Sequence, residues 1–167
     1  NIIYVDKSAT GLNNGNIWGN AYINLEYAIS QALPGDEIWV AAVTYKPILD
    51  TSGTLAIDSR NASFILKDSV KMYGGFTGVE TQRGQRDWKR NVTVLSGEVG
   101  VQGIVDNTYH VVYNRDSLSR ETILDGFTIK GGNANTTSTP SAANYKYYKS
   151  GGGIFNEGAN KAIFRNL

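Results

Sequence analysis

The apolar positions along the chain fall into many short runs that are separated by turn-forming residues. Most runs are rich in Ile, Val, Phe and Tyr and end at Gly, Asn or Asp, as β-strands do. In chain order they are EIWVAAVTY, SFILKD, VKMYGGF, VTVLSGEV, YHVVYN, TILDGFTIKGG, GGGIFN and KAIFRNL. No helical pattern separates these runs, so a doubly wound α/β sheet is not expected. Few Asn-Gly signals join them, so the pattern does not indicate hairpins.

One stretch, NLEYAISQALPGDE, predicts a helix. Its apolar residues recur at helical spacing: Leu25, Ala28, Ile29, Ala32 and Leu33. Asn24 can cap the start of this helix, and Pro34 with Gly35 can end it. We therefore expect a short helix close to the start of the chain.

The order of these segments resembles a known family. The stretches GDEIWVAAVTYKP, ASFILKDSVKMYGGFTGVETQRGQRDWKRNVTVLSGEV, TYHVV, TILDGFTIKGGNA and GGGIFNEG follow one another. This succession resembles the amino-terminal part of the right-handed parallel β-helix proteins that Bacteroidetes secrete or display at the surface. Those proteins are similar in part to chlamydial polymorphic outer-membrane proteins and to pectate-lyase-like folds. The resemblance covers nearly the whole chain and implies an all-β fold, a right-handed parallel β-helix (a solenoid) with a short amino-terminal capping helix.

The resemblance also implies a domain organisation. We expect residues 1–35 to form an amino-terminal cap with the helix, and residues 36–167 to form the coils. A stack of coils exposes strand edges at both ends, and proteins usually cover such edges. Leu25, Ile29 and Leu33 can face the first coil. The last strand pattern stops at Leu167 without a cap, so we expect downstream coils or another polypeptide to cover this edge.

Alternation within the strands predicts which side chains face the core. In DGFTIKGG, Phe127 and Ile129 can point inward while Thr128 and Lys130 point outward. The run of glycines at 151–153 is interpreted as a corner that leads into a strand. A phosphate-binding loop would need a helix after the glycines and a Lys-Ser or Lys-Thr pair, and the sequence IFNEGAN supplies neither.

Charge and composition narrow the function classes. The 16 basic and 15 acidic residues leave a net charge of +1, so the chain lacks the electrostatic footprint of a nucleic-acid-binding protein. No apolar run is long enough to span a membrane. The absence of cysteine excludes disulfides, thiolate zinc sites and cysteine nucleophiles. His110 is the single histidine, and a structural role is expected for it because no G-x-S-x-G motif accompanies it.

No catalytic residue is assigned from the sequence, although four candidates stand out. Polysaccharide lyases of the resembled fold use calcium and a Lys or Arg base, for which Lys130 and Arg115 are placed suitably. Glycosidases use paired carboxyl groups, for which Asp106 and Asp125 are candidates. Solvated surface charges are the ordinary alternative for all four, and Asp125 in LDGF can bond corner amides instead. No cofactor or metal is expected, except calcium if the chain is a lyase.

Aromatic residues supply the candidate binding groups. Tyr145, Tyr147 and Tyr148 lie in a polar loop and can stack on sugar rings, anchor a protein partner, or fold back on the molecule. The stretch QRDWKRN resembles a recognition patch, but we expect Trp88 to cover a coil while Arg86 and Asp87 tie its loop down.

The functional expectation follows the resemblance. We expect a secreted or cell-surface bacterial module for adhesion or structural display that is non-catalytic in this segment. The alternatives are a carbohydrate-active enzyme, either a polysaccharide lyase or a glycosidase, and a glycan-binding module. The expected partners are a glycan and the polypeptide that covers the carboxyl-terminal edge. Nucleic acid is not expected as a partner.

Overall fold

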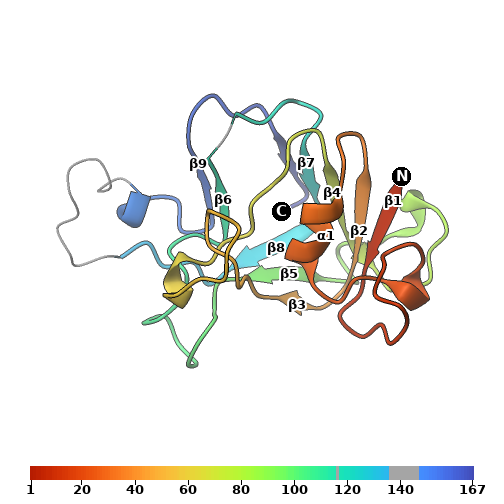
Figure 1. Ribbon diagram of the computed structural model, residues 1–167, viewed down its shortest axis with the longest axis horizontal. Coiled ribbons are helices and arrows are strands. Elements are labelled where there is room, and N and C mark those ends of the chain that lie inside the picture. The colour runs from red at the N-terminus through yellow and green to blue at the C-terminus, as the bar shows by residue number, and fades with distance from the viewer. Residues whose placement is uncertain (116, 136–146) are drawn as a thin grey trace.

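Three separate parallel sheets enclose the core of the protein (Figure 1). The computed structural model describes residues 1–115, 117–135 and 147–167. The first sheet contains, in spatial order, β1 (Ile2–Val5), β2 (Glu37–Ala41), β4 (Lys71–Phe76), β7 (Ile123–Asp125) and β10 (Ile163–Arg165). The second contains β3 (Thr44–Tyr45), β5 (Thr93–Ser96) and β8 (Phe127–Lys130), and the third contains β6 (Val112–Asn114) and β9 (Ile154–Asn156).

Each strand pairs with a strand that is distant in sequence. Every pairing between the named strands is parallel, which agrees with the scarcity of hairpin signals. The registers align one inward column in the five-stranded sheet: Ile3, Ile38, Met72, Leu124 and Phe164. Apolar side chains from all three sheets meet in one buried cluster, so burial of this shared core holds the sheets together.

The expectation of an all-β right-handed parallel β-helix solenoid is wrong. Helices account for 12% and strands for 27% of the structure, and the sheets hold unequal numbers of strands. Segments such as residues 46–70 and 97–111 contain no regular strand, so they interrupt the regular succession of strands that a solenoid would have. The sequence pattern indicates which residues suit a strand, whereas the number of strands in each sheet depends on pairings between distant segments.

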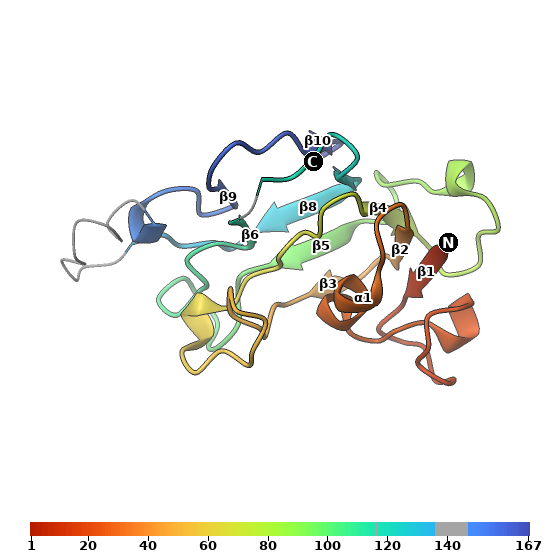
Figure 2. The same cartoon turned by 45° about the horizontal axis from the view of Figure 1, so that its top comes forward.

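Helix α1 (Leu25–Gln31) begins where the sequence predicts. The side chain of Asn24 accepts a hydrogen bond from the backbone N–H of Tyr27 at 2.8 Å and so caps the helix. Leu25 and Ile29 are buried in the core, and α1 lies beside β1 and β2 (Figure 2). The expectation for Leu33 is wrong, because the helix ends at Gln31 and Leu33 is 62% exposed. The short 3₁₀ helices are η1 (Trp18–Asn20), η2 (Ser59–Asn61), η3 (Arg83–Gln85) and η4 (Tyr147–Lys149).

The outer face of the five-stranded sheet is also buried over β2 and β4. Trp39 and Phe76 stack with their ring centroids 4.8 Å apart, and Tyr73 joins them in a second apolar cluster. Trp18 from η1 packs against this cluster and covers it from outside. A sheet that is covered on both faces requires nearly continuous apolar strands, as the runs EIWVA and VKMYGGF show.

Each sheet has two edge strands, and the edge strand that comes later in the chain is β10, β8 or β9. The side chains of β8 alternate as expected, with Phe127 buried, Thr128 and Lys130 exposed and Ile129 half-buried. In β10, Phe164 is half-buried and packs against the core.

The segment that carries Trp88 lies directly on β4, as expected from QRDWKRN. The backbone N–H of Asp87 donates to the carbonyl of Gly75 at 2.8 Å, and Gly75 has a φ of +97°. A Cβ atom at residue 75 would lie 2.7 Å from the backbone N and Cα of Trp88. Only glycine therefore permits this close approach.

Gly75→Ala should accordingly destabilise the protein. We expect its free energy of unfolding to fall by about 1–3 kcal/mol, because alanine adds left-handed strain and a clash with backbone. Chemical denaturation monitored by circular dichroism measures the change. Gly84→Ala is the control, since a Cβ at residue 84 meets nothing within 4 Å. Equal stabilities for the two variants would show that the approach of Trp88 imposes no constraint.

Candidate functional site

Asp125 is the centre of a buried ionic cluster. It is the last residue of β7 and only 1% exposed. Its Oδ2 lies 2.8 Å from Arg86 Nη2 and 2.8 Å from Arg165 Nε, and its Oδ1 accepts from Asn166 Nδ2 at 2.8 Å. Burial opposes ionisation, but the hydrogen bonds from Asn166, Arg86 and Arg165 together lower the pKa of Asp125. The carboxylate is thus engaged in joining three segments.

Arg86 completes this cluster. Its Nη1 donates to the carbonyls of Gly74 at 3.0 Å and Asp125 at 3.2 Å. Its guanidinium carbon lies 5.1 Å from the ring centroid of Tyr73 and 4.8 Å from that of Trp88. A guanidinium that lies between aromatic faces and carbonyl oxygens stabilises the packing of its loop. The contacts of Arg86 therefore support a structural role for QRDWKRN and not a role in recognition.

The other candidate acid and bases lie elsewhere. Asp106 belongs to the loop after β5, and its Oδ2 accepts from the backbone N–H of Val101 at 2.7 Å. Lys130 ends β8 and is exposed, while Arg115 is an exposed residue just after β6. Asp106 and Asp125 share no partner among the contacts described above. The hydrogen bonds of Asp106 and the ion pairs of Asp125 thus involve different parts of the chain.

His110 has the packing of a structural residue. It is 1% exposed, and its ring stacks on Phe155 at 4.8 Å and on Tyr113 at 5.9 Å between centroids. Its Nδ1 lies 3.1 Å from the carbonyl oxygen of Gly151. Gly151 has a φ of +66° and precedes β9, which confirms the corner expected at this glycine run.

The candidate tyrosines are only partly described by the structure. Tyr145 and the side chain of Tyr147 lie outside the described residues. Tyr148, in η4, is half-buried and meets Tyr109 edge to face with centroids 4.6 Å apart. The guanidinium carbon of Arg60 lies 4.2 Å from the ring centroid of Tyr109. We call Arg60, Tyr109 and Tyr148 the aromatic platform.

Backbone and amide groups hold the platform in place. Arg60 Nε donates to the carbonyl of Asn107 at 3.0 Å, and its Nη2 donates to the carbonyl of Asn133 at 2.8 Å. Nη2 also donates to the side-chain oxygen of Asn135 at 2.5 Å. Sequence reasoning missed Arg60 and Tyr109, because residues 60, 109 and 148 come together only in the folded chain.

A second region surrounds Glu26, which sequence reasoning also missed. Glu26 lies in the first turn of α1 and is 6% exposed. Its carboxylate accepts hydrogen bonds from the backbone N–H groups of Ile48 at 3.1 Å and Leu49 at 2.9 Å. Burial raises the pKa of Glu26 despite these bonds. The available signal was an acidic residue next to Leu25 on a helix with an apolar face.

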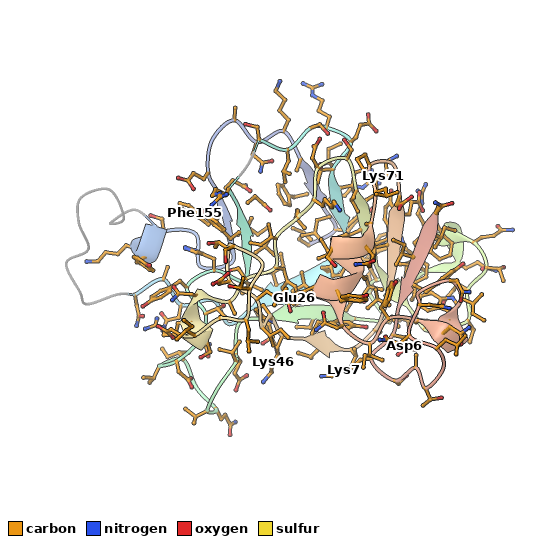
Figure 3. The ribbon with its side chains drawn as sticks, viewed as in Figure 1. Asp6, Lys7, Glu26, Lys46, Lys71 and Phe155 are labelled. Atoms are coloured by element: carbon orange, nitrogen blue, oxygen red, sulfur yellow. The ribbon has the colours of Figure 1, made fainter. Side chains whose placement is uncertain are left out.

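Glu26 borders two cavities. One, of about 370 Å³, lies between α1, residues 49–53 and 63–68 and Leu118, and the other, of about 230 Å³, is lined by Lys7 and Lys46 among others. Figure 3 shows Glu26 in the middle of the molecule with these two lysines on one side of it. We call the larger space the Glu26 cavity. The structure thus offers the half-buried aromatic platform and the Glu26 cavity as candidate sites.

Two observations bear on cofactors and membranes, and both concern the described residues only. Within residues 1–115, 117–135 and 147–167, no three His, Asp or Glu side chains gather as ligands for a metal ion. Over the same ranges, no helix has the length and apolar character needed to cross a membrane.

Comparison of the chain with protein-family models, with curated proteins and with solved structures finds no match.

Proposed function

We propose that this chain is a non-catalytic adhesion module that contacts a glycan through the aromatic platform. The observation that carries the proposal is the half-buried pair Tyr109 and Tyr148 with Arg60 stacked beside it. Aromatic rings offer apolar faces to the C–H faces of sugars, while a guanidinium and nearby amides bond hydroxyl groups. The proposed location, secreted or at a bacterial surface, rests on the sequence resemblance alone.

The contacts of the acidic residues favour binding over catalysis. A glycosidase needs two carboxyl groups that face one cleft. Asp125 is instead held by Arg86, Arg165 and Asn166, and Asp106 accepts the amide of Val101. Structural engagement of this kind supports a module that holds a ligand without converting it.

Tyr148→Ala tests the proposal. A glycan array first identifies ligands of the wild-type protein, and calorimetry then gives their affinity. We expect Tyr148→Ala to weaken binding about fivefold, because one aromatic contact is worth roughly 1 kcal/mol. The matched control is Tyr27→Ala on α1, because Tyr27 is 49% exposed and its ring meets that of Tyr22 edge to face.

Three outcomes would contradict the proposal. The first is the absence of any glycan ligand, and the second is an affinity that Tyr148→Ala leaves unchanged. The third is the release of unsaturated or hydrolysed sugar products, which would establish the carbohydrate-active enzyme instead. A thermal melt of each variant checks that the fold is intact.

A further inference from the structure

The Glu26 cavity has aliphatic walls. They are formed by Ile29, Leu49, Ile65, Leu66 and Leu118. The volume of about 370 Å³ lies within the range of sites for small ligands, about 300–1,000 Å³. Aliphatic walls give water few hydrogen-bond partners, so replacing water there with carbon is favourable. The body of a suitable ligand is therefore apolar.

The charged residues at this cavity are mainly acidic. Glu26, Asp50 and Asp68 line it together with one basic residue, Lys67. Hydrogen bonds from the Ser52 side chain and backbone, and from Thr54, lower the pKa of Asp50. Hydrogen bonds, first of all from the backbone of Ser119, lower the pKa of Asp68 to about 2. Both carboxyl groups are thus ionised at neutral pH.

Lys67 offsets only one of these three negative charges. Its ammonium donates to the carbonyl oxygen of Ser30 in α1 at 3.1 Å. Three carboxyl groups against one ammonium give a net charge of −2 when all are ionised. A cation is therefore favoured at this cavity over an anion.

Glu26 retains acceptor capacity at the cavity. Its Oε1 accepts from two backbone N–H groups, whereas Oε2 accepts only from that of Ile48, which both oxygens share. A carboxylate has about four lone-pair sites, so Oε2 can accept another donor. Because burial disfavours the charged form of Glu26, a donor with a positive charge would offset an existing cost.

We propose that the Glu26 cavity binds a small amphipathic cation: a primary ammonium group on an aliphatic chain. The ammonium donates to Glu26, and the chain lies against Ile29 and Leu66. The same chemistry occurs in a free alkylamine and in the side chain of a lysine on another polypeptide. The site is formed by α1, residues 49–53 and 63–68 and Leu118, and it includes no residue of the aromatic platform.

Titration with three ligands of equal chain length tests the charge preference. Hexylammonium, hexan-1-ol and hexanoate are each added to the full chain, followed by ¹H–¹⁵N NMR. We expect hexylammonium to give saturable shifts at residues 26–30, 49–53 and 63–68. Hexan-1-ol should bind at least about tenfold more weakly, and hexanoate should not saturate. Equal affinities for hexylammonium and hexan-1-ol, or no saturable shift with hexylammonium, would overturn the proposal.

Two variants test the assigned groups. Glu26→Gln keeps an oxygen for the amides of Ile48 and Leu49 but removes the charge, and we expect at least a tenfold loss of hexylammonium affinity. The matched control Glu98→Gln, outside the cavity, should bind like the wild type. If Glu26→Gln does not fold, Ile65→Phe fills the cavity from a half-buried position and should abolish binding. Wild-type affinity in either folded variant would refute the site.

A further pair of ligands distinguishes the two sources of the ammonium group. The probes are hexylammonium and a lysine blocked at both backbone ends, with its side-chain ammonium unmodified. Tighter binding of hexylammonium assigns the site to free amines, and tighter binding of the blocked lysine assigns it to a polypeptide partner. Failure of both probes to bind would overturn the proposal, and it would leave the glycan proposal untouched because the platform is a separate site.

Discussion

Asp125→Ala should lower the free energy of unfolding by about 3–5 kcal/mol, the range for breaking a buried ion pair from one side. Arg86 is 8% exposed in its side chain and would remain buried without its carboxylate. The change would also release Arg165 and Asn166, which hold β10 and the residue after it to β7. Chemical denaturation monitored by circular dichroism measures the loss.

A control and a pH series test this explanation. Arg165 is 51% exposed in its side chain, so Arg165→Ala should cost less than about 1 kcal/mol. Because the folded-state pKa of Asp125 is lowered, its contribution is present above the unfolded value of 3.8 and is lost as pH falls through the folded value. The stability gap between wild type and Asp125→Ala should therefore narrow below about pH 4. If the free energy of unfolding of Asp125→Ala at pH 7 lay within about 1 kcal/mol of that of the wild type, the ionic cluster would not have the stabilising role described here.

The second large effect is expected at α1. Leu25→Asp should lower the free energy of unfolding by about 4 kcal/mol or more, because it removes a buried aliphatic side chain and places a charge in the core. Leu25 is 2% exposed and belongs to the main apolar cluster. It is also the first residue of the helix, where an aspartate favours helix formation. Any loss therefore reports packing and not helix propensity.

Leu33→Asp is the matched control for this change. Leu33 follows the helix and is 62% exposed. The free energy of unfolding of the Leu33→Asp variant should therefore stay within about 0.5 kcal/mol of that of the wild type. Thermal and chemical denaturation of both variants give the comparison. Similar losses at the two positions would show that the helix is not docked on the core as described.

The sequence by itself determined the local structure. Asn24 caps α1, the alternation of Phe127 and Ile129 with polar neighbours describes β8, and Gly151 forms a corner before β9. Each depends on residues only a few positions apart, through capping geometry, the two-residue period of a strand, or the allowed φ of glycine. The apolar pattern predicted a helix up to Leu33, whereas the helix ends two residues earlier, at Gln31. The difference arises because Leu33 continues the apolar pattern.

Tertiary structure alone decided the fold class and the candidate sites. The expected solenoid is wrong because the sizes of the sheets depend on pairings between strands far apart in the chain. Arg86 and Asp125 are 39 positions apart, so the sequence could not show that the carboxylate is neutralised. The aromatic platform and the Glu26 cavity likewise join distant segments. Local patterns fix what a segment can form, but burial and charge at a site are set by whichever segments the shared core brings together.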